Sequence, residues 1–392
     1  MNKKDVATKK RPSLLARLLS FLITLGLVLG AVLLVANYDK LNFDTIKRYF
    51  NYHTLEKNEN GETGEFSYNS GGAFTYFAAL SGDLLVCSDS GIRLYSSGGN
   101  IYIDRQPLKN PVLTSTGTTA VIYDAGGTDL FVIRNREVVF SPTLEESNSI
   151  IAASVSKTGY LALVHQAGGY KSALTVYGAD GNKVMQLSLS TRFIMDAVVS
   201  PDGKQVAVLT MGLENNVVDS TISLYPLDGK SGEAPQVDGQ FSLGNTTVLS
   251  LRWDSSGIWT LREDQLTLTD TAGETLAEYS YSGQYLKEFT MDGTGFSALL
   301  LGKYRAGTTA TLLLLNSKGE AATLPVNEQI LSLSAAGRYI AVLTADRLDI
   351  YTQDLTLIST LEGTQSARQV LMQEDGSVLL ISSKTARIYL PD

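Results

Sequence analysis

A glycine-bearing turn returns along this chain of 392 residues at a nearly constant interval. Its glycines are Gly82, Gly117, Gly159, Gly203, Gly257, Gly295, Gly337 and Gly376. Seven steps separate the first from the last over 294 residues, a mean of 42 residues per step. A four-stranded blade of a β-propeller takes about 40–45 residues. The interval therefore predicts a propeller. It excludes sandwiches, which lack this period, and β-helices, whose repeats are much shorter.

Each repeat joins this turn to segments that resemble strands. Ser, Asp and Asn side chains beside the glycines can close a turn onto the backbone, while glycine supplies the positive φ of a tight hairpin. Strongly apolar runs follow the turns, as at Leu84–Cys87, Val206–Thr210 and Tyr339–Leu343. Such runs fit strands that neighbouring blades cover on both faces. The predicted fold class is an all-β propeller over residues 65–392.

The last repeat indicates how the ring closes. The seventh repeat continues into a fourth strand at Leu355–Leu361, whereas the eighth stops at Leu390 without one. Residues Glu65–Asn69 precede the first repeat and can supply the missing strand. Joining the first strand to the last blade removes the open edges of the ring. We expect eight blades closed in this way, with seven blades as the alternative if the weak first repeat is misassigned.

The N-terminal segment predicts one membrane-spanning helix. Leu18–Ala36 is a run of 19 residues without charge. At about 1.5 Å per residue it nearly covers the roughly 30 Å of bilayer hydrocarbon. Six Lys and Arg side chains precede it, so residues 1–17 are expected to be a basic tail in the cytoplasm. The alternative is a cleaved signal peptide, but Leu34 stands where the cleavage signal needs a small residue if Ala36 is the last residue removed.

Residues 37–64 are expected to connect the membrane helix to the propeller. Leu41, Ile46 and Phe50 lie near helical spacing, which predicts a short juxtamembrane helix at Asp44–Tyr52. The polar, glycine-bearing segment Asn58–Gly64 is predicted to be a linker.

Charge and the rarest residues exclude several classes of function. The net charge is −8, and residues 1–17 contribute +5, so the remainder sums to −13. An acidic body of this kind excludes a nucleic-acid partner, which needs clustered Lys and Arg. Cys87 is the only cysteine, and its apolar run predicts a place in the core. His53 and His165 are the only histidines, so a three-histidine zinc site is impossible.

No motif in the chain singles out a catalytic residue. A nucleophile elbow, a P-loop and a dinucleotide-binding glycine motif are all missing from the sequence. We therefore assign no catalytic residue, no metal and no cofactor. A pair of catalytic carboxylates remains open, because 40 acidic residues allow many pairings.

Three enlarged loops suggest a binding face. His165–Ser172, Met211–Ser220 and Gly302–Thr308 each join the second strand of a repeat to the third, and such loops gather on one face of a propeller. Tyrosine, arginine and amide groups in these loops suit contacts with protein or glycan. The alternative is that they are solvated hairpin tips. The candidate residues are His165, Tyr170, Lys171, Asn215, Asn216, Lys303, Tyr304 and Arg305.

One turn resembles a known family. Ser200–Val208 reads SPDGKQVAV and is similar to the blade turn of TolB-like and WD40-like propellers, while the other seven turns are looser versions. The layout as a whole resembles an uncharacterised bacterial family with a basic N-terminus, one signal-anchor helix and a propeller. The resemblance implies a protein of the bacterial cell membrane whose propeller lies outside the cytoplasm, and it implies no activity.

These observations predict a non-enzymatic interaction or scaffold module at the cell envelope. The lipid bilayer would hold it through residues 18–36, and its partners would be envelope proteins or glycan. The alternative is a hydrolase or lyase acting on envelope carbohydrate with carboxylates in the propeller funnel. That alternative predicts several converging carboxylates with raised pKa values.

Overall fold

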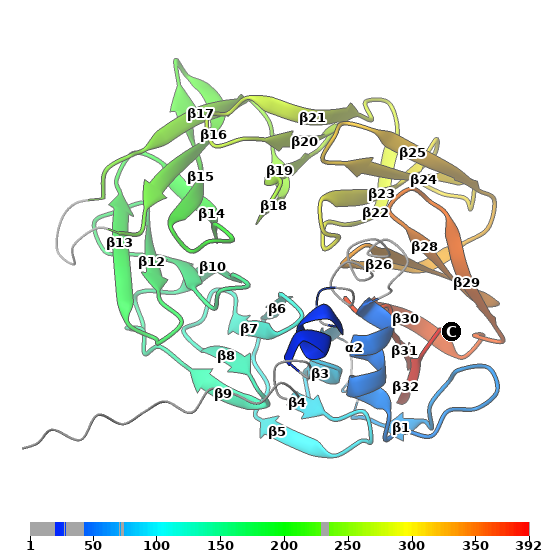
Figure 1. Cartoon of the computed structure of the whole chain (residues 1–392). Helices are drawn as coiled ribbons and strands as arrows, with labels where there is room; N and C mark the ends of the chain where they lie inside the picture. The colour runs from blue at the N-terminus through cyan, green and yellow to red at the C-terminus, as the bar shows by residue number, and fades with distance from the viewer. Residues whose placement is uncertain are drawn as a thin grey trace, which may run out of the picture.

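Eight four-stranded antiparallel sheets stand in a ring in the computed structural model, which describes residues 20–26, 28, 43–69, 71, 74–228 and 235–391 (Figure 1). The prediction of an eight-bladed propeller is confirmed, and the seven-bladed alternative is wrong. Blades 1 to 7 each use four consecutive strands, and blade 8 combines the last three strands with the first.

Four concentric rings of strands make up the blades. The innermost strands are β2 (Thr75–Leu80), β6 (Pro111–Ser115), β10 (Ile150–Val155), β14 (Phe193–Val199), β18 (Val248–Asp254), β22 (Tyr285–Thr290), β26 (Ile330–Ala336) and β30 (Ala367–Met372). The second strands are β3 (Asp83–Ser88), β7 (Thr119–Asp124), β11 (Leu161–His165), β15 (Gln205–Glu214), β19 (Gly257–Arg262), β23 (Phe296–Gly302), β27 (Tyr339–Thr344) and β31 (Val378–Ser382).

The outer half of each blade completes the sheet. The third strands are β4 (Gly91–Tyr95), β8 (Leu130–Arg134), β12 (Ser172–Tyr177), β16 (Val217–Pro226), β20 (Gln265–Thr269), β24 (Ala310–Asn316), β28 (Arg347–Thr352) and β32 (Thr385–Tyr389). The outermost strands are β5 (Ile101–Arg105), β9 (Glu137–Phe140), β13 (Lys183–Leu189), β17 (Gly239–Gly244), β21 (Thr275–Ser280), β25 (Ala321–Val326), β29 (Leu357–Glu362) and β1 (Phe66–Ser67).

Burial follows the position of a strand in its blade. The second strands β3, β7, β23 and β27 are buried at every residue, because neighbouring blades cover both of their faces. The outermost strand β9 alternates between exposed and half-buried residues, and β25 does so up to its last residue, the buried Val326. One hydrophobic cluster fills each of the eight interfaces between blades. Cys87 lies in the cluster between blades 1 and 2, as predicted, and burial raises its thiol pKa to about 12.

The repeated turn has the backbone that the sequence predicted. All eight of its glycines have positive φ values, between 57° and 142°. The hydroxyl Oγ of Ser200 accepts hydrogen bonds from the backbone N–H groups of Lys204 and Gln205 at 3.1 and 3.0 Å. A side-chain oxygen thus satisfies donors inside the turn while glycine adopts the left-handed conformation.

Blade 8 closes with the predicted N-terminal strand. In β1, Phe66 pairs with Ala386 and Ser67 pairs with Thr385 of β32. The segment predicted as a linker, Asn58–Gly64, also contacts this blade. Its Thr63 N–H donates to the Ile388 carbonyl at 2.9 Å, and the Gly61 carbonyl accepts from the Leu390 N–H at 2.9 Å. Within Asn58–Gly64 the backbone is therefore attached to the ring.

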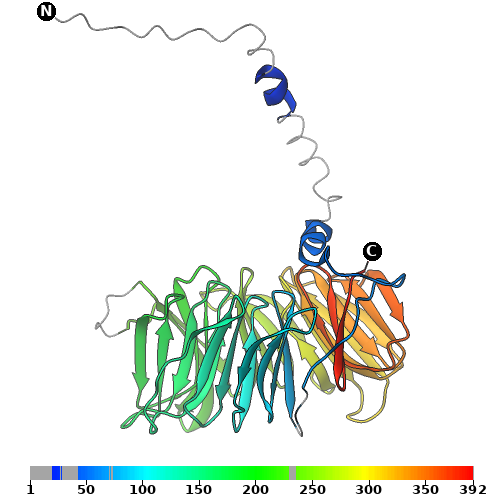
Figure 2. The same cartoon turned by 90° about the horizontal axis from the view of Figure 1, so that it is seen from below.

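The predicted short helix is present as α2 (Phe43–Tyr52), and it lies against one face of the ring (Figure 2). Residues 20–26 are helical, but most of the predicted membrane helix at residues 18–36 lies outside the described residues. In the described part of the chain, no helix has both the length and the apolar character needed to cross a membrane.

Candidate interaction surfaces

The up-and-down order of the strands gives the ring two different faces. We call the face that carries the turns between first and second strands the turn face, and the face that carries the connections between second and third strands the loop face. The helix α2 lies on the turn face, since its contacts reach the turns of blades 7 and 8. The loop face is therefore on the side of the ring opposite α2.

Polar side chains dock α2 on the turn face. The Tyr339 hydroxyl donates to Asp44 at 2.9 Å, and the Asn51 amide donates to Asp375 at 3.0 Å. The Tyr52 hydroxyl accepts from the Gln373 side chain at 3.0 Å, and its ring is buried between blades 8 and 1. Burial raises the pKa of Tyr52 well above its ordinary value. These contacts fix the helix on the ring.

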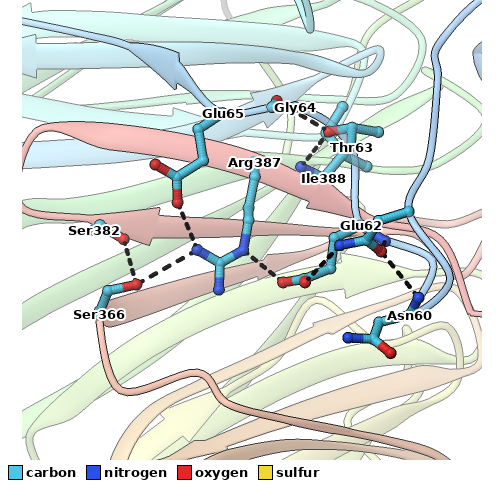
Figure 3. A network of polar contacts seen from close by, with 10 residues as sticks. Asn60, Glu62, Thr63, Gly64, Glu65, Ser366, Ser382, Arg387 and Ile388 are labelled. Carbon is cyan, nitrogen blue, oxygen red and sulfur yellow. Dashed lines mark hydrogen bonds and ion pairs between the residues drawn. The ribbon is translucent and has the colours of Figure 1, made fainter.

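An ion-pair network holds the N-terminal segment to blade 8 (Figure 3). Arg387 Nε lies 2.6 Å from a carboxylate oxygen of Glu62, and Nη1 lies 2.8 Å from one of Glu65. The side chains of Arg387 and Glu62 are only 10% and 16% exposed. Arg387 Nη1 also donates to the Ser366 hydroxyl at 3.4 Å. The guanidinium thus ties residues 53–65, which we call the strap between α2 and β1, to β32 and to Ser366 just before β30.

On the turn face, contacts also cross the central opening. Lys157 Nζ lies 2.6 Å from a carboxylate oxygen of Glu374, and these residues belong to turns of blades 3 and 8, which are not neighbours. A second contact joins turns of the neighbouring blades 6 and 7, where the Thr294 N–H donates to the Gly337 carbonyl at 2.6 Å. The opening is therefore narrowed on the side where α2 lies.

Most predicted site residues are exposed on the loop face. Tyr170 and Lys171 lie between β11 and β12, and Tyr170 is 52% exposed. The Lys171 ammonium lies 5.0 Å from the Phe193 ring centre at the start of blade 4, so this loop leans toward that blade.

The connection between the second and third strands of blade 6 lies apart from the loop that carries Tyr170 and Lys171. It carries Lys303, Tyr304 and Arg305 between β23 and β24, and all three side chains are exposed. Tyr304 is 66% exposed, and the Lys303 ammonium lies 5.5 Å from its ring centre. Blade 5 separates this connection from blade 4, so the structure puts the predicted residues on one face but not in one cluster.

His165 does not belong to the exposed surface. It is the last residue of β11 and only 5% exposed. Its Nδ1 lies 2.8 Å from the Gln166 carbonyl, which can only accept, so Nδ1 carries the proton. Its Nε2 lies 3.0 Å from the Thr175 hydroxyl and accepts from it. Both ring nitrogens are used inside the blade, which corrects the placement of His165 in the binding face.

The predicted loop Met211–Ser220 is largely a β-hairpin. Strands β15 and β16 continue three residue pairs beyond the last pairing of β14, Phe193 with Met211. Asn215 and Asn216 form the two-residue turn with φ values of 51° and 64°, as a type I′ hairpin requires. At about 3.4 Å per residue, the hairpin projects about 10 Å from the sheet.

Apolar side chains, missed by the sequence analysis, lie along this hairpin. Leu213 and Val218 are directly paired and are 70% and 41% exposed, and Val217 is 51% exposed. The sequence contained a signal for them, because an Asn-Asn pair between Leu/Val-bearing flanks indicates a tight hairpin and not a loop. The hairpin therefore exposes apolar side chains, where the sequence predicted contacts through the amide groups of Asn215 and Asn216.

A polar network stiffens the base of the hairpin. Arg192 Nη2 lies 2.9 Å from a carboxylate oxygen of Asp219, and Nε donates to the Thr210 hydroxyl at 3.0 Å. Burial acts to raise the pKa of Asp219, but hydrogen bonds from Ser242, Thr221 and Arg192 outweigh it and lower the pKa. A carboxylate held ionised at this point keeps the Arg192 pair intact at neutral pH.

Inside the ring, a cavity of about 330 Å³ is bounded by inner strands of blades 5 to 8. Arg252 lies 3.5 Å from Asp292 at its edge. Asp292 is 73% exposed, but it faces this cavity, where surrounding protein displaces bulk water and raises its pKa. Burial also raises the pKa of Glu288, and that of Asp196 to about 6. In all three, burial is the main cause and no second carboxylate contributes.

A second hollow, of about 710 Å³, lies between the outer strands of blades 1 and 2. Its aromatic rings already have cationic partners. The Arg136 guanidinium lies 4.4 Å from the Tyr102 ring centre, and that of Arg105 lies 5.0 Å from the Phe131 ring centre. Arg136 is also paired with Asp83 at 2.6 Å. Among the described residues, no three His, Cys, Asp or Glu side chains are grouped so as to hold a metal ion.

Fold and surfaces together define a β-propeller with one helix docked on its turn face. The chain belongs to a family of unknown function, DUF5711, whose model matches residues 45–390. No curated protein sequence matches it.

One solved structure supports the fold, and a second match is more distant. The C-terminal WD40 domain of Sif2 is 12% identical, with a TM-score of 0.53 over 85% of this chain and 97% of that one. The structure of BBS1N in complex with ARL6DN, soaked with mercury, is also 12% identical, with a TM-score of 0.44 over 84% and 96% of the two chains. At this level of identity the likeness to the WD40 domain concerns the fold alone.

Proposed function

We propose that this protein is a membrane-tethered interaction propeller of the bacterial cell envelope, which presents its loop face to a protein partner. The observation that carries the proposal is the opposite placement of two features. The chain enters the ring through α2 on the turn face, and the projecting hairpin with exposed Leu213 and Val218 lies on the loop face. A tether at one face leaves the other free to bind.

The tether is the uncharged run Leu18–Ala36, with the basic residues 1–17 in the cytoplasm. A tether raises the effective concentration of the ring at the membrane, so that modest contacts suffice for binding. Alkaline carbonate washing of membranes tests this part. The full chain should stay with the lipid, and its release into the wash would contradict the tether.

The binding face is tested by site-specific photo-crosslinking in cells. A photoreactive residue at Leu213 or Tyr170 should give a discrete protein adduct. The matched control is Leu357 on the outer strand β29, which is 52% exposed, as is Tyr170. Combined Leu213→Ser and Val218→Ser replacement should then abolish the adduct formed from position 170. Equal adducts from all three positions would contradict a specific loop-face partner.

The Tyr170 and Tyr304 loops are tested together with the hairpin. Replacing Tyr170, Tyr304 and Arg305 by alanine should weaken recovery of the same crosslinked partner, because aromatic and guanidinium groups dominate protein contacts. Unchanged recovery would restrict the partner site to the hairpin of blade 4.

A carbohydrate hydrolase or lyase has less support. An enzyme of this kind predicts carboxyl groups with raised pKa values near the ring centre, and Asp196, Glu288 and Asp292 have raised pKa values. Glycosidases use two carboxylates about 5–10 Å apart that differ in role, whereas burial acts on each of these groups separately. An Asp196→Asn, Glu288→Gln double variant separates the two functions. Loss of envelope-glycan cleavage in that variant would favour the enzyme.

A further inference from the structure

The helix α2 turns its apolar side away from the protein. Ile46, Tyr49 and Phe50 recur at helical spacing and are 47%, 65% and 69% exposed. The opposite side makes polar contacts with the turns of blades 7 and 8 through Asp44 and Asn51, and it buries the Tyr52 ring between blades 8 and 1. A surface helix of a soluble domain normally packs its apolar stripe on the core. Here three large apolar side chains are left exposed on the outer side of α2, which indicates that a further apolar surface covers them.

The preceding sequence limits what that cover can be. Six residues lie between Ala36, the end of the uncharged run Leu18–Ala36, and Phe43 at the start of α2. The seven Cα–Cα steps from Ala36 to Phe43 span at most about 25 Å when fully extended. If the run crosses the bilayer, α2 cannot be farther than this from the end of the hydrocarbon region. A headgroup layer is itself about 5–8 Å thick, so α2 is within reach of the membrane surface.

The composition of the outer stripe fits that surface. Tyrosine is enriched where hydrocarbon meets headgroups, because its ring is apolar and its hydroxyl is polar. Interfacial helices bury their apolar side about 5–10 Å into this boundary. Lys47 is exposed beside the stripe, and its long side chain can place an ammonium among lipid phosphates.

We propose that α2 lies in the headgroup region of the bilayer with Ile46, Tyr49 and Phe50 inserted. This inference rests on the proposed function, because the tether brings α2 to the membrane. Its consequence is a fixed orientation. The polar side of α2 is bonded to the ring, so insertion of its other side holds the turn face against the membrane and directs the loop face away.

A single fluorescent label tests the proposal on the full chain. Cys87 is fully buried, so an introduced surface cysteine can be labelled selectively with an environment-sensitive NBD dye. Phe50→Cys is the test position, and Leu213→Cys is the control because it replaces an equally exposed apolar residue on the loop face. The chain is reconstituted in phosphatidylglycerol and phosphatidylethanolamine vesicles, and thermal unfolding verifies that both variants fold.

The label at position 50 should emit several-fold more strongly and at shorter wavelength than the label at position 213. Nitroxides attached to lipid near the headgroup should quench it, while aqueous iodide should quench only position 213. If the two positions behave alike and the chain resists carbonate washing, the interfacial helix is overturned and the tether stands. A blue shift without quenching by lipid nitroxides means that protein covers α2, and it also overturns the proposal. Release by carbonate overturns both the interfacial helix and the tether.

Discussion

The turn face and the loop face are built from the same eight repeats, but their connections behave differently. On the turn face the connections between first and second strands have two to five residues, carry glycines of positive φ, and bond to α2 and across the ring opening. On the loop face the connections between second and third strands have two to seven residues, and several present exposed side chains. The turn face thus contributes contacts that hold the ring together, while the loop face presents side chains to solvent. Recognition residues usually lie on exposed loops of this kind.

The largest expected effect comes from the strap that brings α2 to the turn face. Arg387→Ala leaves the Glu62 carboxylate, 16% exposed, without its cation. Loss of one partner of a buried pair costs about 3–5 kcal/mol of unfolding free energy. Urea unfolding of the purified wild-type and Arg387→Ala chains measures this loss of unfolding free energy.

The matched control for this variant is Glu65→Gln. The Glu65 carboxylate bonds to the same guanidinium but is 49% exposed, so its loss should cost less than about 1 kcal/mol. Equal losses from the two variants would show that the strap does not depend on the buried pair.

The same substitution on both faces gives the most direct comparison. Tyr52→Ala removes a ring that is 4% exposed and packed between blades 8 and 1, and we expect a loss of about 3 kcal/mol. Tyr304→Ala removes a ring that is 66% exposed, and we expect a change within about 0.5 kcal/mol. Chemical denaturation measures both. Comparable losses would remove the distinction between the two faces.

A pH titration examines Asp196, which lies on the inner strand β14 between the turn face and the loop face. Asp196 has its pKa raised by burial to about 6, from 3.8. Its neutral form therefore contributes stability that is complete below about pH 4 and lost as the pH rises through about 6. The unfolding free energy should therefore fall by on the order of 1 kcal/mol between about pH 4 and pH 6.5, after allowing for water in the ring.

Asp196→Asn keeps the side-chain oxygen that accepts from the Ala197 N–H and removes the titration. The variant should lack the part of the wild-type stability loss between pH 4 and pH 6.5 that belongs to this group. Parallel pH profiles for the two proteins, measured by urea unfolding, would argue against a buried neutral carboxyl.

The smallest effect on stability is expected at the hairpin. Leu213→Ser and Val218→Ser alter exposed side chains beyond the end of the sheet, so each should change the unfolding free energy by less than about 0.5 kcal/mol. Binding should nevertheless fall, as measured by loss of the adduct at position 170. A large loss of stability would assign the hairpin to the framework.

The sequence predicted the fold more completely than it predicted the residues of the candidate binding surface. The eight glycines and the apolar second strands follow local rules, and the closing strand near Phe66 follows from the missing fourth strand of the last repeat. All are present in the structure. His165 was placed at a loop because it ends an apolar run, but its nitrogens bond to Gln166 and Thr175. Asn58–Gly64 has the composition of a linker, but its backbone groups bond to β32.

Periodicity and turn chemistry act between residues close in the chain, so the order of residues alone sufficed to predict the blade and its repeat, whereas the structure decided between eight blades and seven. The docking of α2, the Arg387 network and the contact of Lys157 with Glu374 join residues more than 200 positions apart. Such contacts follow from how the closed ring brings its ends and turns together in space, and no local pattern in the chain encodes them.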